Sequence, residues 1–334
     1  MKTVRWGIIG CGNVTEVKSG PAFYKVPGSE LVAVMRRDEH LARDYAKRHN
    51  VSKWYAKAED LINDPDVDAI YIATPPASHK EYALLCAKAR KPVYVEKPMA
   101  ISFTECNEML IAAKDTNTPL FVAFYRRALP RFQKIYELIN IEMVIGRPII
   151  VNTVLYKRHE EIYQNPESLP WHVRPEISGG GLFVDLAPHT LDILDFLFGE
   201  ITSVKGYASS QLKAYPAEDC VSMSFIFKNG MHGVGHWNFC SYADYDNVEI
   251  IGDKGKISFA TFGDGAITVE NAGGKAEIRL DNPEHIQMPM ITSVVNELLG
   301  KSGSCLSTGE SAARTNWVMD QVLSEYYSLK NNNY

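Results

Sequence analysis

The sequence lacks the cysteine pairs that would build a zinc site or a disulfide framework. Its 334 residues include six cysteines, and no two of them form a C-x-x-C pair. This scatter argues against a disulfide-stapled secreted domain and against a structural zinc domain, so a reducing compartment is expected. The cysteines are Cys11, Cys86, Cys106, Cys220, Cys240 and Cys305.

A surplus of positive charge and a long apolar run are also lacking. Lysine and arginine number 35 against 40 aspartates and glutamates, a formal net charge of −5. That balance predicts no surface for nucleic acid or an anionic membrane. No apolar run approaches the length of a membrane span, and the apolar segment from Arg5 starts too early to follow a signal peptide. We therefore expect a cytoplasmic protein with a small-molecule partner, no nucleic acid and no membrane.

Length and composition are those of a folded protein with two domains. Hydrophobic residues make up 46% and charged residues 22%, and 334 residues exceed the size at which one core keeps growing. Up to residue 123, short β-branched runs alternate with amphipathic stretches, which predicts a doubly wound parallel sheet. Its expected strands are 5–9, 30–35, 69–73, 92–96 and 120–123, and its expected helices are 41–49, 78–89 and 103–114.

The second half is rich in strands joined by hairpin-type turns, after a helical stretch at 131–141. We expect an α+β domain with a large open, mostly antiparallel sheet. A helix at 182–198 and a C-terminal pair at 290–299 and 311–329 are expected to cover one face. The predicted domains are 1–123 and 124–334. The expected strands of the second are 149–156, 204–207, 221–227, 231–238, 248–251 and 256–259.

A glycine-rich turn follows the first expected strand. Gly10 and Gly12 match the first two glycines of the dinucleotide fingerprint, with Thr15 at the position of the third small residue. The first glycine permits a tight turn and the second lets a pyrophosphate approach the backbone. The strand, turn and helix context predicts a Rossmann domain whose Gly10, Gly12, Asn13 and Val14 bind a dinucleotide; a plain glycine turn is the alternative.

The end of the second strand bears on which nucleotide is bound. An acidic residue there would hold the ribose hydroxyl of NAD, whereas a cation would accept the 2′-phosphate of NADP. The residues present are Arg36 and Arg37, two guanidiniums able to clamp a phosphate. NADP(H) is therefore the preferred cofactor. Asp38 leaves NAD(H) open, and a solvated surface cluster is the alternative to any clamp.

Glu96, Lys97 and Pro98 follow another expected parallel strand, at the carboxyl edge where such sheets bind ligands. Beside a nicotinamide, Lys97 can polarise a carbonyl or donate a proton. A surface lysine at the start of a loop is the alternative.

A polar stripe marks the apolar helix expected at 182–198. Asp185, His189 and Asp192 lie four and three residues apart and so share one helix face. We interpret His189 as a general acid or base for a substrate hydroxyl, with Asp185 orienting it or binding the substrate. A satisfied core histidine and a metal site are the alternatives. No third ligand is indicated, so no metal is expected.

The segments 10–12, 74–79, 96–98 and 179–189, in this order and spacing, resemble the Gfo/Idh/MocA oxidoreductase family over almost the whole chain. The resemblance implies hydride transfer between NAD(P) and sugars, polyols or cyclic alcohols. It implies that Lys97 and His189 form the catalytic pair, assisted by Asp185. It also implies that the nicotinamide and ribose are lined by Thr74, Pro75 and His79, with Glu96 close by.

The segment 171–176 resembles the substrate loop of the branch that contains glucose-fructose oxidoreductase-like enzymes and dihydrodiol dehydrogenases. There Trp171 would stack on a sugar ring and Arg174 would bind a hydroxyl or carboxylate. Tyr125 and Arg126 match a family position that faces the cleft. A surface loop anchored by an aromatic side chain is the alternative for each.

Two other functions fit the same resemblance. One is a regulator that binds nucleotide and sugar without turnover, which retention of Lys97, Asp185 and His189 disfavours. The other is a related enzyme acting on a polycyclic diol or a bilin. The open sheet of the second domain predicts a homodimer or homotetramer.

Overall fold

The protein is described by a computed structural model that covers residues 2–163, 165–301 and 303–331. The chain packs into two compact units. The first comprises Met1–Leu129 and Pro283–Ala313, and the second comprises Pro130–Asn282 and Arg314–Tyr334. The predicted boundary after residue 123 is close to the first break, but the division by packing also returns a later segment to the first unit.

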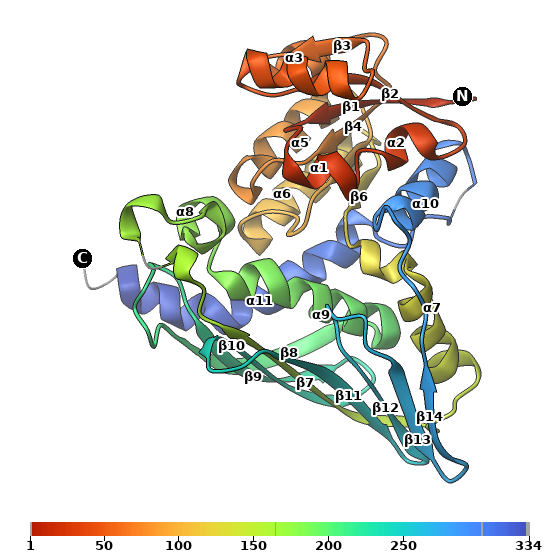
Figure 1. The fold of residues 1–334 in the computed structure, drawn as a ribbon, viewed down its shortest axis with the longest axis vertical. Coiled ribbons are helices and arrows are strands. Elements are labelled where there is room, and N and C mark those ends of the chain that lie inside the picture. Colours follow the sequence, from red (N-terminus) through yellow and green to blue (C-terminus); the bar gives the residue numbers. More distant parts are fainter. Residues whose placement is uncertain (1, 164, 302, 332–334) are drawn as a thin grey trace. The chain divides into compact units, whose positions relative to one another are not determined.

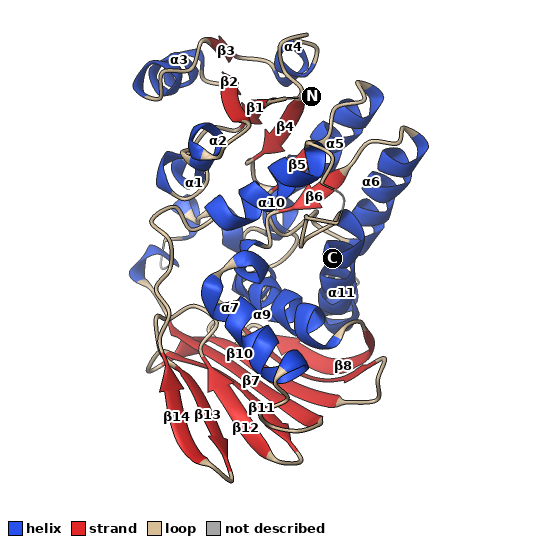
Figure 2. Cartoon of the chain, turned by 90° about the vertical axis from the view of Figure 1, so that its right-hand side faces the viewer, coloured by secondary structure: helices blue, strands red, loops and turns tan. Residues whose placement is uncertain are grey.

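The first unit is built on a six-stranded sheet whose pairings are all parallel, in the order β3-β2-β1-β4-β5-β6 (Figure 2). This is the expected doubly wound sheet, with the reversal of strand order between β1 and β4. The short edge strand β3 was missed because three half-buried residues carry no periodic signal. The strands are β1 Val4–Ile9, β2 Ser29–Met35, β3 Lys53–Tyr55, β4 Ala69–Ile72, β5 Val93–Val95 and β6 Leu120–Val122.

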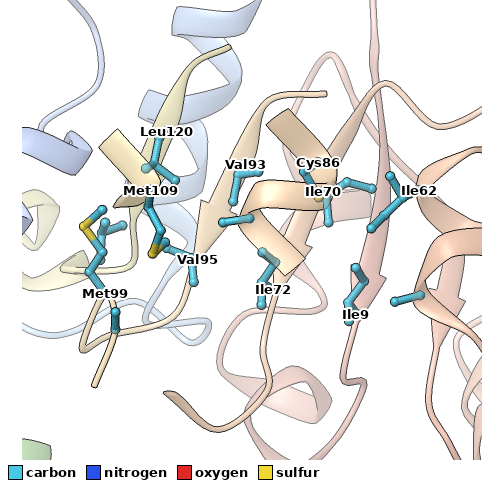
Figure 3. Packing of buried hydrophobic residues seen from close by; sticks show 14 of the residues in the cluster. Ile9, Ile62, Ile70, Ile72, Cys86, Val93, Val95, Met99, Met109 and Leu120 are labelled. Carbon is cyan, nitrogen blue, oxygen red and sulfur yellow. The ribbon is translucent and has the colours of Figure 1, made fainter. Parts of the chain in front are cut away.

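Both faces of this sheet are buried, because alternate side chains enter two different clusters. Ile70 and Ile72 of β4 belong to the first cluster, whereas Tyr71 belongs to the second. Figure 3 shows the first cluster, where strand side chains meet Cys86 and Met109. The helices of this unit are α1 Asn13–Val17, α2 Ala22–Lys25, α3 Glu39–Arg48, α4 Ala58–Ile62, α5 His79–Lys88, α6 Phe103–Asp115 and α10 Met288–Leu298.

Helix α10 corrects one expectation. We predicted that the helix near 290–299 would cover the sheet of the second half, but α10 packs in the first unit. Its Met290, Ile291 and Val294 are fully buried in the cluster that contains Trp6 and Phe23. The apolar stripe was read correctly, but a stripe alone does not say which sheet it meets.

The second unit is built on an eight-stranded sheet, ordered β14-β13-β12-β11-β7-β10-β9-β8 (Figure 2). Only the pairing of β7 with β10 is parallel, so the expected mostly antiparallel sheet is confirmed. The last two strands were missed; β14 is almost wholly exposed and so lacks an apolar alternation. The strands are β7 Pro148–Arg158, β8 Ile201–Ser209, β9 Cys220–Phe227, β10 His232–Ser241, β11 Tyr245–Gly252, β12 Gly255–Phe259, β13 Ile267–Asn271 and β14 Gly274–Ile278.

One face of this sheet carries α9, which contacts β9 and β10, and the helix has the predicted bounds (Figures 1 and 2). Val234 and His236 of β10 are exposed on the opposite face. The helices are α7 Pro130–Tyr136, continued by a π-helical turn Glu137–Ile141, then α8 Pro175–Ser178, α9 Leu182–Phe198 and α11 Gly309–Asn331, whose first turn lies in the first unit.

Two buried acidic groups fasten α9 to α11. Asp195 accepts two hydrogen bonds of 2.7 Å from the guanidinium of Arg314. Glu218 accepts from the backbone N–H of Gly181, at the start of α9, and from the hydroxyl of Tyr327. All six cysteines carry free thiols. Among the helices of the described ranges, none has the length and hydropathy needed to cross a bilayer.

Candidate functional site

The glycine turn is shaped by a close approach of two strand ends. Gly10 has φ +88°, and a Cβ there would lie 2.6 Å from Thr74 Cγ2 and 3.0 Å from the Thr74 backbone nitrogen. Gly12 caps α1, and the hydroxyl of Thr15 both accepts from the Gly12 N–H and donates to its carbonyl. Thr15 therefore stabilises the turn at the position where the fingerprint has a smaller residue.

Arg36 lies beside this turn. Its guanidinium donates to the carbonyl oxygen of Cys11 over 3.3 Å, and Arg37 is exposed. The carboxylate of Asp38 accepts from the backbone N–H of Leu41 and so caps α3. The carboxylate that follows the two arginines in sequence thus caps a helix, whereas the Arg36 guanidinium lies against the glycine turn.

His79 is fully buried and joins two loops of the sheet edge. Its Nε2 lies 2.7 Å from the Thr74 carbonyl, and its Nδ1 lies 3.1 Å from the Pro98 carbonyl and 3.3 Å from that of Met99. Burial lowers the pKa of the imidazole, against the opposing effect of these carbonyls and of Glu96. Thr74 is half-buried and Pro75 is exposed, whereas the contacts of His79 are to backbone carbonyls.

Glu96 and Lys97 directly follow β5, and the Glu96 carboxylate contacts the Lys97 backbone. Glu96 is 8% exposed and accepts from the Tyr71 hydroxyl, from the Gln287 amide and from the Lys97 backbone N–H, at 2.5, 2.7 and 3.2 Å. The Lys97–Pro98 peptide bond is cis. Sequence reasoning missed Tyr71, which reads as a core residue of its strand, and Gln287, which is 191 residues away from Glu96.

Tyr125 and Arg126 lie in a 3-10 turn, Tyr125–Ala128, directly after β6. The Arg126 guanidinium lies 5.2 Å from the centre of the Tyr125 ring, in a cation–π contact, and only 8% of Arg126 is exposed. The half-buried Tyr125 is therefore the more accessible of the two predicted substrate contacts.

In the second unit, α9 carries the predicted polar stripe. Asp185 is half-buried, whereas His189 is 5% exposed and Asp192 is 1% exposed. The ring of Phe262 meets the imidazole of His189 edge to face, with centroids 5.4 Å apart. Phe262 was missed because it lies in a glycine-rich turn between β12 and β13, which has no periodic signal.

That turn is fastened in three ways. Asp246 accepts from the backbone N–H groups of Thr261 and Phe262, at 3.0 and 2.7 Å. The hydroxyls of Thr190 and Thr261 are 2.9 Å apart. The buried guanidinium of Arg131 donates to the carbonyls of Ala260 and Gly263. The loop that carries the aromatic ring beside His189 is therefore held by several hydrogen bonds.

Trp171 is 40% exposed and packs edge to face on His172. The Tyr163 hydroxyl lies 3.0 Å from His172 Nε2. Burial, together with the charges of Glu160 and Asp185, raises the pKa of Tyr163 to about 12, so the phenol keeps its proton at neutral pH. Because the charge of Asp185 acts on Tyr163, this phenol belongs to the surroundings of the polar stripe.

Arg174, the other predicted substrate contact of this segment, is exposed. It forms an exposed ion pair of 2.9 Å with Glu176, two residues on. Within residues 2–163, 165–301 and 303–331, no group of three or more His, Cys, Asp or Glu residues could hold a metal ion. The structure thus assembles the glycine turn, Thr74, His79 and the Lys97 strand end in the first unit, and Asp185, His189 and an aromatic group in the second.

The doubly wound sheet, its glycine turn and the second, sheet-based unit together define a dinucleotide-binding protein with a separate α/β unit. Family models agree with this class. Residues 4–124 match the oxidoreductase family with the NAD-binding Rossmann fold, and residues 132–258 match the GFO/IDH/MocA C-terminal domain. The chain belongs to the Gfo/Idh/MocA oxidoreductase family, and it is an NAD(P)-dependent oxidoreductase.

Individual relatives cover nearly the whole chain. An oxidoreductase of Formosa agariphila is 42% identical over 317 residues, 95% of this chain and 97% of its own. The 1,5-anhydro-D-fructose reductase of Ensifer adhaerens is 26% identical, covering 92% and 91%. Levoglucosan dehydrogenase, in complex with NADH and levoglucosan, has the same fold, with a TM-score of 0.85 at 21% identity over 96% of each chain.

Proposed function

We propose that this oxidoreductase transfers a hydride between NADP(H) and a carbon that bears a hydroxyl or carbonyl on a sugar, polyol or related cyclic alcohol. The nicotinamide supplies the hydride chemistry, and the protein supplies orientation and proton transfer. Lys97 and His189 are the proton-transfer residues, and Asp185 orients the imidazole or the substrate.

The proposal rests on the presence of Lys97, His189 and Asp185 in one chain. Lys97 lies at the carboxyl edge of the parallel sheet, where folds of this kind bind ligands. Asp185 and His189 lie one turn apart on α9, and a rigid aromatic loop supports the imidazole. A regulator that only binds nucleotide and sugar would need no such set, so nucleotide binding without turnover of any substrate would favour that alternative.

The preference for NADP(H) rests on Arg36 and Arg37. A guanidinium beside the glycine turn is suited to a 2′-phosphate, and the carboxylate of Asp38 already caps α3. Parallel fluorescence titrations with NADPH and NADH test the preference. Tighter binding of NADPH supports it, and tighter binding of NADH overturns it while leaving the oxidoreductase assignment intact.

The substrate class comes from the relatives. Besides the anhydrofructose reductase and levoglucosan dehydrogenase, they include a myo-inositol 2-dehydrogenase of Thermotoga maritima, 27% identical over 76% of this chain. The decisive screen follows absorbance of the reduced nicotinamide with levoglucosan, myo-inositol and 1,5-anhydro-D-fructose. Turnover of any of them that is lost in both Lys97→Met and His189→Asn supports the proposal, and full activity in either variant refutes that residue's role.

A second candidate substrate class is an aromatic diol. The trans-1,2-dihydrobenzene-1,2-diol dehydrogenase of mouse is 30% identical over 69% of this chain. The side chains of Trp171 and Phe262 offer apolar ring surfaces near the polar groups of the second unit. Including trans-1,2-dihydrobenzene-1,2-diol in the same screen decides between the two classes by the ratio of kcat/KM.

The sheet face of the second unit that exposes Val234 and His236 is proposed as the contact of a homodimer or homotetramer. Val234 is 37% exposed at the centre of β10, next to the parallel pairing with β7. Light scattering measures the assembly, and Val234→Lys, which places a charge on that face, should reduce its mass. A monomeric wild-type protein would exclude this contact.

A further inference from the structure

A buried hydrogen-bond network lies beneath Lys97, and the proposed chemistry does not explain it. One carboxylate oxygen of Glu96 accepts from both the Tyr71 hydroxyl and the Gln287 side-chain amide. The other accepts from the Lys97 backbone N–H. Bonds to a charged acceptor in a dry interior are stronger than neutral ones, so this carboxylate is held in one place.

The donors keep their protons at every working pH. Burial raises the pKa of Tyr71 well above its ordinary value, and the charge of Glu96 raises it further. The Gln287 amide does not titrate. The chain therefore retains two fixed donors to one oxygen of Glu96, and the other oxygen of that carboxylate accepts from the backbone N–H of the proposed catalytic lysine.

The same donors reach the segment that follows the glycine-turn helix α1. The Gln287 backbone N–H donates to the carbonyl of Lys18 over 3.1 Å, and the Tyr71 hydroxyl lies 3.1 Å from Ser19 Oγ. Gln287 lies in the segment Pro283–Ala313, which returns to the first unit. Its backbone bonds to the end of α1 and its side chain bonds to Glu96, so this one residue connects α1 with the strand end that carries Lys97.

We infer that Tyr71 and Gln287 are positioning residues of this oxidoreductase, which act through Glu96 to set the backbone of Lys97 relative to the nucleotide-binding turn. The inference rests on the proposed role of Lys97. Because reacting groups that are displaced by about 1 Å lose roughly 100-fold in rate, a small relaxation of this network has a large effect on turnover.

A matched pair of tyrosines tests the inference. Tyr71 and Tyr94 are fully buried on neighbouring strands, with ring centroids 5.3 Å apart. Of the two tyrosines, only Tyr71 donates to Glu96, whereas the Tyr94 hydroxyl donates to Gln287 Oε1 over 3.3 Å. Tyr71→Phe should lower kcat about 10- to 100-fold and leave KM and NADPH affinity within about 3-fold. Tyr94→Phe should leave kcat within about 3-fold, because the bonds to Glu96 persist.

Gln287→Met and Glu96→Gln extend the test. Methionine keeps the size of Gln287 but removes its amide, so kcat should fall as in Tyr71→Phe. In Glu96→Gln, the new side-chain NH₂ group faces either the Lys97 N–H or the two donors Tyr71 and Gln287. Two donors then face each other, so kcat should also fall. The kcat–pH profile should shift in these variants, whereas a purely structural defect would lower the melting temperature and leave the profile in place.

A second readout needs no substrate. Trace acetylation with acetic anhydride, followed by peptide mass spectrometry, measures the reactivity of the Lys97 amine against that of the exposed Lys228, in protein saturated with NADPH. The ratio should change by about 3-fold or more in Tyr71→Phe and Gln287→Met, but not in Tyr94→Phe. If Tyr71→Phe and Gln287→Met match Tyr94→Phe in both assays, the inference is overturned. If the wild type turns over no substrate of the screen, the proposed function fails, and the acetylation ratio still decides on the network.

Discussion

The two units carry their chemistry on different kinds of element. In the first, the glycine turn, Thr74 and Lys97 follow three neighbouring parallel strands, so the sheet itself brings them to one edge. In the second, Asp185 and His189 lie on one helix, and their surroundings come from loops distant in sequence. Strand-end chemistry is therefore predictable from the order of elements, whereas the surroundings of a helix face depend on which loops reach it.

Both units also rely on segments that return from far along the chain. Gln287 supports the lysine edge, and Arg314 pairs with Asp195 of α9. In each case a buried carboxylate is satisfied by a donor more than 100 residues away. The returning C-terminal portion thus stabilises the candidate site of each unit.

The largest expected effect is on the lysine edge of the first unit. Lys97→Met should lower kcat about 10²- to 10⁴-fold with little change in nucleotide affinity, because an acid or electrostatic group is lost while the glycine turn is intact. Steady-state kinetics and nucleotide titration measure the two quantities. Lys114→Met, at an exposed lysine of α6, is the control. A fall of NADPH affinity in parallel with kcat would make Lys97 a binding residue instead.

A smaller loss is expected on the helix face of the second unit. His189→Asn should lower kcat about 10- to 1,000-fold, and Phe262→Leu about 10-fold, because the second change removes only the ring that supports the imidazole. His232→Asn, at an exposed histidine of β10, serves as control. If Phe262→Leu lowers the melting temperature and leaves kcat unchanged, the loop contributes to stability only, and the contrast between the units weakens.

The nucleotide clamp should respond selectively. Arg36→Asp should weaken NADPH about 10- to 100-fold more than NADH, since it replaces a phosphate-binding cation by an anion. Fluorescence titration of both nucleotides gives the ratio, and Arg43→Asp on the exposed side of α3 controls for net charge. Equal weakening of both nucleotides would remove the clamp from Arg36.

The smallest effect concerns acid stability of the first unit. Burial favours the neutral form of Asp64, yet hydrogen bonds from Lys53, the Asp66 N–H and Tyr55 lower its pKa to about 2. Because this value lies below the usual pKa of about 4, the carboxylate stabilises the fold above pH 4 and loses that contribution as pH falls from about 4 to 2.

Lys53→Met should therefore lower the free energy of unfolding at pH 7 and flatten its dependence on pH between 4 and 2, because Asp64 loses its charged partner. Denaturant melts across that range measure both. Lys157→Met, which removes an exposed pair with Asp244 in the second unit, should change stability by less than about 0.5 kcal/mol. Equal acid sensitivity of the two variants would contradict the conclusion that Lys53 lowers the pKa of Asp64.

Much of the fold was predictable. Helix α9 has the predicted bounds, and the five predicted strands of the first half match β1, β2, β4, β5 and β6 within about two residues. Two of the three missed strands share a cause: β3 and β14 are short edge strands with little burial, so neither leaves an apolar alternation. The third, β13, is an inner strand with buried Ile267 and Val269, and it was overlooked. The role of each predicted site residue stays a prediction until the variants above are measured.

By itself, the sequence determined the elements, the glycine turn, the lysine at a strand end and the aspartate–histidine spacing on one helix, because each depends on neighbours within a few residues. Only the tertiary structure decided that α10 packs with the first unit, that Gln287 reaches Glu96 and that Phe262 reaches His189. An apolar stripe or a polar side chain specifies the kind of partner it needs, whereas the identity of that partner follows from packing the whole chain.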